Sequence, residues 1–133
     1  MAKQGISYDM IMSDLRRKAY APVYLLMGEE AYYIDQISDF IQNNVLDEGQ
    51  REFDLTVVYG KDTDMTTIVN AAKRYPMMSP CQVVIVKEAQ LIKDWEPLQY
   101  YVNKPSSTTI LVLGYKYGTP DKRKKWVLDI AKC

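Results

Sequence analysis

A short apolar run that ends at a glycine and continues into two glutamates constrains the fold of this chain more than any other stretch. Residues Val23 to Met27 are too few for a buried helix, favour strands, and lie between Pro22 and Gly28. Such a run is typical of a strand covered on both faces, as in a parallel α/β sheet. Gly28 then marks a strand-to-helix turn, where α/β proteins bind phosphate with backbone N–H groups and the helix dipole.

The residues that follow Gly28 lack the chemistry of phosphate binding. A working phosphate loop uses several glycines to wrap the anion, a lysine for the outer phosphates and a serine or threonine for magnesium. This chain has Glu29 and Glu30 in that place. Two carboxylates repel phosphate, although they suit the start of a helix. The sequence therefore predicts a degenerate phosphate turn at Gly28, Glu29 and Glu30, and we expect no cofactor.

Composition excludes several classes of function. The 133 residues suffice for one domain or part of one, and 17 basic residues balance 17 acidic ones. A binder of duplex DNA that works by bulk electrostatics is therefore not expected, and any DNA contact should be indirect or weak. The chain has no histidine, which excludes His-based catalysis and the usual zinc sites, so no metal is expected. Without a secretory or membrane-spanning run, a cytoplasmic location away from membranes is expected.

Apolar spacing predicts strands that alternate with helices along the chain. Helices are expected at 7–19, at 29–45, from the cap Asp64 to the break at Tyr75, at 94–102 and at 122–132; strands are expected at 23–27, 53–59, 82–86 and 108–113. A turn is expected at 47–50, and Asp54 favours a place near the sheet edge for its strand. The β-branched strand 82–86 should lie centrally.

This alternation, without a hairpin signal, predicts an α/β fold of three layers, in which a parallel sheet has helices on both faces. The chain stops after an amphipathic helix, where a further strand would be expected to return to the sheet. Residues 1–133 are therefore interpreted as one domain of a longer protein, truncated before its last strand.

The loop before the strand 82–86 is a candidate binding site. It contains Met77 and Met78, flanked by Pro76, Ser79 and Pro80. Two adjacent methionines cannot both point inward from most loop conformations, so we expect at least one to be exposed. Methionine recurs at protein-binding surfaces, and a loop stiffened by prolines loses less entropy on docking. The alternative is that both methionines pack over helix ends as core filler.

Two other candidates are weaker. Glu88 follows the strand 82–86 and could position magnesium, but Lys87 at the strand end weakens this interpretation, and a single carboxylate there is more often a cap or solvated. The basic run at 122–125 could touch a phosphate backbone or an acidic partner, although such runs are more often the solvated side of a helix.

Taken together, four stretches resemble the N-terminal domain of the delta subunit of the bacterial DNA polymerase III clamp loader. They are residues 23–30, residues 76–79 with the strand 82–86, residues 98–105, and residues 108–113. They occur in the family's order and at its spacing, across about residues 20–115. No single motif is specific, but the ordered set is.

This resemblance implies an AAA-like P-loop NTPase fold that has lost ATP binding, in agreement with the argument from Glu29 and Glu30. It implies that Met77 and Met78 insert into a pocket of the sliding clamp (the beta subunit) and favour opening of the ring for loading onto primed DNA. The other implied partners are the clamp-loader subunits gamma/tau and delta prime, within the DNA polymerase III holoenzyme, which is classed as a DNA-directed DNA polymerase. The sequence departs from the commoner pattern, in which at least one of the pair is leucine or phenylalanine.

Two alternatives stay open at this point. The chain could be a nucleotide- or flavin-binding α/β enzyme or switch with an atypical phosphate loop. It could also be a DNA-binding module that uses residues 122–125, in which case its affinity would depend steeply on salt.

Overall fold

The computed structural model describes residues 8–28 and 31–116 of the chain. Its helices are α1 (Tyr8–Arg16), α2 (Ala31–Asn44), α3 (Glu48–Asp54), α4 (Met65–Ala72) and α5 (Glu96–Asn103), with short 3-10 turns η1 (Gly60–Asp62) and η2 (Ala89–Leu91). Its strands are β1 (Val23–Gly28), β2 (Leu55–Tyr59), β3 (Gln82–Lys87) and β4 (Thr109–Lys116). The helix predicted at 122–132 lies outside the described residues.

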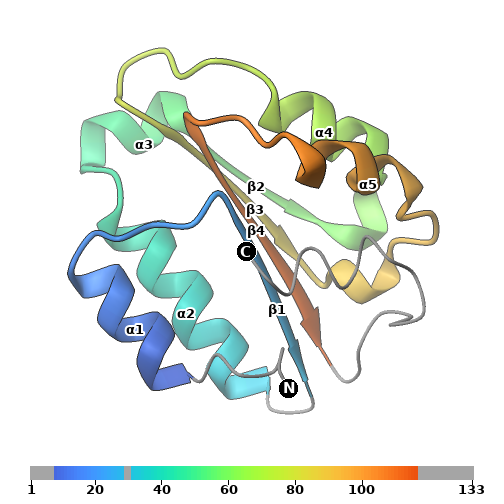
Figure 1. Ribbon diagram of the computed structural model, residues 1–133, viewed down its shortest axis with the longest axis horizontal. Coiled ribbons are helices and arrows are strands. Elements are labelled where there is room, and N and C mark those ends of the chain that lie inside the picture. The colour runs from blue at the N-terminus through green and yellow to red at the C-terminus, as the bar shows by residue number, and fades with distance from the viewer. Residues whose placement is uncertain (1–7, 29–30, 117–133) are drawn as a thin grey trace.

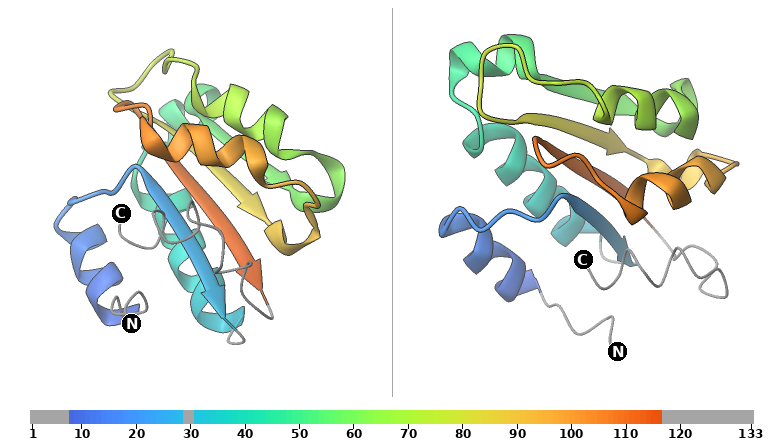
Figure 2. Two further views of the ribbon diagram at one scale, coloured as in Figure 1. Left: turned by 45° about the vertical axis from the view of Figure 1, so that its right-hand side comes forward. Right: turned by 45° about the horizontal axis from the view of Figure 1, so that its top comes forward.

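The described strands form one four-stranded parallel sheet in the order β1-β4-β3-β2. Helices α1 and α2 cover one face, and α4 and α5 cover the other (Figure 1). Figure 2 shows the same three layers from two further directions. The prediction of a parallel sheet between helical layers is therefore confirmed, as is the central position of the strand that begins at Gln82.

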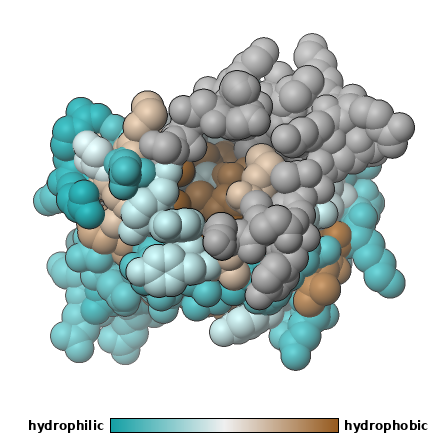
Figure 3. All heavy atoms as spheres, turned by 90° about the horizontal axis from the view of Figure 1, so that it is seen from below, coloured by the Kyte–Doolittle hydropathy of each residue, from teal (hydrophilic) through white to brown (hydrophobic). Residues whose placement is uncertain are grey.

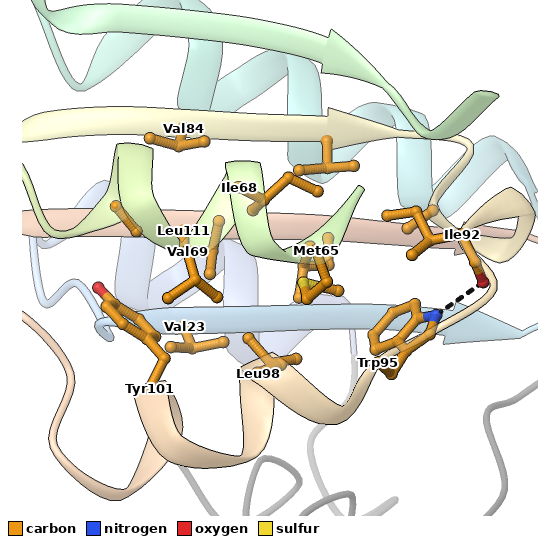
Figure 4. Close-up of a cluster of buried hydrophobic side chains, with 14 of the residues drawn as sticks. Val23, Met65, Ile68, Val69, Val84, Ile92, Trp95, Leu98, Tyr101 and Leu111 are labelled. Atoms are coloured by element: carbon orange, nitrogen blue, oxygen red, sulfur yellow. Dashed lines mark hydrogen bonds between the residues drawn. The ribbon is translucent and has the colours of Figure 1, made fainter. Parts of the chain in front are cut away.

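Side chains of the two inner strands alternate between two apolar clusters. Val84 and Val86 of β3 pack with residues of α4 and α5, whereas Val83 and Ile85 pack with residues of α1 and α2. Figure 4 shows the first cluster, where Leu98, Tyr101 and Trp95 approach the sheet and Trp95 Nε1 donates a hydrogen bond to the Ile92 carbonyl at 3.0 Å. Burial on both faces explains why these strands are continuous apolar runs.

The turn predicted at residues 47–50 is wrong, because this segment begins helix α3. Asp47 and Gln50 form a capping box: the Gln50 N–H donates to Asp47 Oδ1 at 2.8 Å, and the Asp47 N–H donates to Gln50 Oε1 at 3.1 Å. These bonds satisfy two N–H groups that a helix start leaves free. The helix runs through Phe53, so the strand predicted from that residue begins instead at Leu55.

Among the described strands, β1 and β2 are the outer ones. Leu25 and Met27 of β1 are accordingly only partly buried. Figure 3 views the molecule from below Figure 1; most of the coloured side chains at the left and lower margins are polar, and apolar ones are visible near the centre and at the right margin. Within the described part of the chain, none of the helices combines the length and the apolar character that crossing a membrane would need.

Gly60, at the start of η1, lies directly against the backbone of Glu88. A Cβ atom at position 60 would lie 2.2 Å from the Glu88 carbonyl oxygen. We expect Gly60→Ala to lower the free energy of unfolding by about 1–3 kcal/mol, because backbone must move to admit the methyl group. Urea denaturation measures the loss, and Gly49→Ala is the control because its Cβ would meet only Asp47 Oδ1, at 3.8 Å. Equal stability of the two variants would contradict the packing described here.

Candidate functional site

The loop between α4 and β3, which we call the methionine loop (residues 75–81), lies at the amino end of β3. It is therefore at the opposite end of the parallel strands from Gly28, the last residue of β1 (Figure 1). Met77 is 76% exposed and Met78 is 61% exposed. The expectation that at least one methionine is exposed is confirmed, and the alternative that both fill the core is excluded.

The carboxylate of Asp54 holds the backbone of the methionine loop. The N–H groups of Met77 and Met78 donate to Asp54 Oδ1 at 2.6 Å and to Oδ2 at 2.8 Å, and Ser79 Oγ donates to Oδ2 at 2.5 Å. Asp54 ends helix α3 and is only 4% exposed. This role of Asp54 was not predicted from the sequence, because Asp54 was interpreted as evidence that its strand lies near the sheet edge.

The two ends of the methionine loop are fixed by polar side chains at the amino ends of β3 and β4. The Gln82 side-chain amide donates to the carbonyls of Ala71 at 3.0 Å and Arg74 at 2.6 Å, and Thr109 Oγ1 donates to the Ala72 carbonyl at 2.7 Å. These bonds help satisfy the carbonyls at the end of α4, of which that of Ala71 also accepts from the Arg74 N–H at 3.2 Å. The methionine loop thus has ordered attachments before, within and after its exposed residues.

Protonation of Asp54 should loosen this arrangement. Burial raises the pKa of the Asp54 carboxyl, but the hydrogen bonds from Ser79, Met77 and Met78 outweigh it and hold the pKa below its usual 3.8. The ionised group therefore stabilises the native state above that value, and the stabilisation is lost as the pH falls through the native pKa. We expect the stability difference between the wild type and Asp54→Asn to shrink as the pH is lowered from about 5. Urea denaturation at several pH values measures it, and a constant difference would contradict the expectation.

At the carboxyl ends of the strands, Lys116 forms ion pairs with two acidic side chains. Gly28 and Lys116 are register partners in β1 and β4. Lys116 Nζ lies 2.9 Å from Asp35 Oδ1 and 3.3 Å from Glu88 Oε2. Burial lowers the pKa of the Lys116 ammonium, but Asp35 and Glu88 outweigh it and raise the pKa. Glu88, the candidate magnesium ligand, is therefore paired with a cation of the protein itself.

The remaining residues that the sequence analysis named as candidate site residues lie partly inside and partly outside the described part of the structure. Pro76, Ser79 and Pro80 flank the methionines in the loop, as the sequence requires. Glu29, Glu30 and the basic run at 122–125 lie outside the described residues. Among the residues that the structure describes, no cluster of three or more histidine, cysteine or acidic side chains could hold a metal ion.

The chain is thus an α/β domain with a parallel sheet, and an exposed apolar loop lies at the end of the sheet where the strands begin. The family described as "DNA polymerase III, delta subunit" matches residues 24–132 of the chain. The chain therefore belongs to the DNA polymerase III delta subunit family, and the resemblance found in the sequence is confirmed.

Individual relatives agree with this assignment. The DNA polymerase III subunit delta of Bacillus subtilis is 26% identical over 132 residues, covering 92% of this chain and 38% of that protein. The solved structure of the B. subtilis DNA clamp loader delta protein has a TM-score of 0.83 at 25% identity, covering 95% of this chain and 40% of that one. A DNA polymerase III gamma subunit-related protein of Thermotoga maritima shares the fold, with a TM-score of 0.55 at 14% identity, covering 92% of this chain and 42% of that one. The chain spans about two fifths of the length of these relatives.

Proposed function

We propose that this chain is part of a clamp-loader subunit of DNA replication and docks onto the sliding clamp with Met77 and Met78. The observation that carries the proposal is that two adjacent methionines are mostly exposed while hydrogen bonds fix the backbone that bears them. Exposed apolar side chains on an ordered loop lose little entropy when a partner covers them. Pro76 and Pro80 restrict the backbone on either side.

The proposed docking favours one state of the clamp. Burying two methionine side chains yields about 1.5–3 kcal/mol each, which is too little to hold an opened ring once association costs are included. It is enough to shift an equilibrium if the clamp binds the loop more tightly when its ring is open. Met77 and Met78 would then assist ring opening for loading onto primed DNA.

The domain of residues 1–133 is proposed to be AAA-like with a degenerate nucleotide site. Two features support this: a single glycine at the turn, where a phosphate loop needs several, and the pairing of Glu88 with Lys116, which takes the carboxylate away from magnesium. Control by ATP would come from the partner subunits gamma/tau and delta prime, and the chain would contribute no catalysis of its own.

Retention on the immobilised sliding clamp from the same source tests the proposal. We expect the chain to be retained, and to remain bound when the salt is raised from about 50 to 200 mM, because an apolar contact depends weakly on salt whereas phosphate contacts depend on it steeply. Absence of retention at low salt would overturn the proposal. Retention on DNA that is lost with salt would favour the DNA-binding alternative.

Nucleotide titration tests the rival assignment. We expect ATP, ADP and FMN at about millimolar concentration to leave the unfolding temperature of the chain unchanged, because a ligand that binds the native state would raise it. A rise that saturates with one of these ligands would favour a nucleotide- or flavin-binding α/β protein.

A further inference from the structure

We propose that Asp54 is a positioning residue for clamp docking, which fixes the methionine loop in a conformation that presents both Met77 and Met78 to solvent. This inference rests on the proposed function, because docking is the event that the positioning serves. It concerns a residue 23 positions away from Met77 in the chain, on a different element.

The geometry of the hydrogen bonds carries the inference. Two consecutive backbone N–H groups, those of Met77 and Met78, point at the two oxygens of one carboxylate. Successive backbone N–H groups directed at one anion form a concave, anion-binding arrangement. With both peptide N–H groups turned toward Asp54, the loop holds its two methionine side chains outward, as their exposure shows.

The carboxylate is suited to this role because its charge is buried and compensated. Asp54 is 4% exposed, and its oxygens accept from two backbone donors and from Ser79 Oγ. Hydrogen bonds to an ionised acceptor are about twice as strong as neutral ones. Loss of the charge would leave the N–H groups of the loop poorly paired, and the loop would turn them to water instead.

Because Asp54 is buried, its proposed role is to position the loop and not to contact the sliding clamp directly. A side chain that is 4% exposed offers almost no surface to a partner, whereas Met77 and Met78 offer most of theirs. Suppose that, without the Asp54 carboxylate, only a fraction of the molecules adopt the docking conformation. The apparent dissociation constant for the clamp then equals the intrinsic constant divided by that fraction. A loop that adopts it one tenth of the time would bind about tenfold more weakly.

Asp54→Asn, which keeps the shape of the side chain but removes its charge, tests the inference. In the free protein, we expect amide hydrogen exchange at Met77 and Met78 to become about tenfold faster or more, and exchange at Val84 in β3, which reports unfolding of the whole sheet, to accelerate less. Binding to the sliding clamp should weaken about fivefold to tenfold. In the background of Met77→Ala with Met78→Ala, Asp54→Asn should cause no further loss.

The outcomes separate this inference from the proposed function. Unchanged exchange at Met77 and Met78 would overturn it, as would equal acceleration at Val84, which would show that Asp54 supports the whole fold. Faster exchange with unchanged clamp affinity would overturn the role in docking. If the wild type does not bind the clamp, the proposed function fails while the exchange measurement still tests the anchoring. If Asp54→Asn does not fold, Ser79→Ala removes the hydroxyl donor to Asp54, and the inference then requires a smaller change in the same direction at Met77 and Met78.

Discussion

Replacing Met77 and Met78 together by alanine is expected to weaken binding to the sliding clamp by about tenfold or more, while the unfolding temperature stays nearly unchanged. The two side chains are 76% and 61% exposed, so their truncation removes little packing within the chain. In the proposed complex the same atoms are buried, and a loss of about 1.4 kcal/mol in binding already corresponds to a factor of ten. Biolayer interferometry with immobilised clamp, combined with thermal denaturation, measures both quantities.

Met10→Ala is the matched control for this prediction. Met10 is 54% exposed and belongs to α1, on the face of the sheet opposite α4 and α5 (Figure 1). The substitution removes the same atoms from a different surface, so clamp affinity should be unchanged. If the double variant binds as tightly as the wild type, or if Met10→Ala weakens binding equally, the assignment of the docking residues is wrong.

Leu111→Ala is expected to lower the free energy of unfolding by about 3–5 kcal/mol. Leu111 lies in β4, an inner strand, and its side chain is fully buried in the cluster that α4 and α5 cover. Truncation removes buried methyl groups and leaves a cavity that the surrounding helices and strands can fill only in part. Urea denaturation followed by circular dichroism measures the loss.

The control for the core prediction is Leu91→Ala. Leu91 lies in η2 and is 50% exposed, so its truncation should change stability by no more than about 0.5 kcal/mol. Similar losses for Leu91→Ala and Leu111→Ala would contradict the position of β4 at the centre of the sheet.

The sheet could be predicted from the sequence because its signals are local. The apolar runs at 23–27, 82–86 and 108–113 are short and bounded by turn residues, and all three occur as strands. The sequence also predicted Asp64 as a helix N-cap, and in the structure the Thr67 N–H donates to Asp64 Oδ1 at 2.8 Å. The prolines around the methionines also predicted the loop.

Helix α3 was missed although its cap is visible in the sequence. Asp47 and Gln50 have the spacing of a capping box, but Gly49 between them and the lack of a long apolar pattern favoured a turn. A helix of 7 residues is too short for periodicity to identify. A search for caps before apolar periodicity would have found it.

The contacts of Asp54 and Lys116 could not be predicted, because they join residues that are far apart in the chain. Asp54 meets Ser79 across 25 positions, and Lys116 meets Asp35 across 81. The residues adjacent to Asp54 in the sequence do not indicate which distant residues it contacts. Only the packing of α3 beside the loop before β3 reveals that this carboxylate holds the backbone of the two methionines.

Calorimetric titration of the chain into the purified sliding clamp from the same source tests whether Met77 and Met78 dock onto the clamp. We expect saturable binding with a negative heat-capacity change, the marker of apolar surface being buried, and we expect both to diminish strongly in Met77→Ala with Met78→Ala. Absence of binding at clamp concentrations of about 100 μM, which corresponds to less than about 5.5 kcal/mol of affinity, would contradict this expectation.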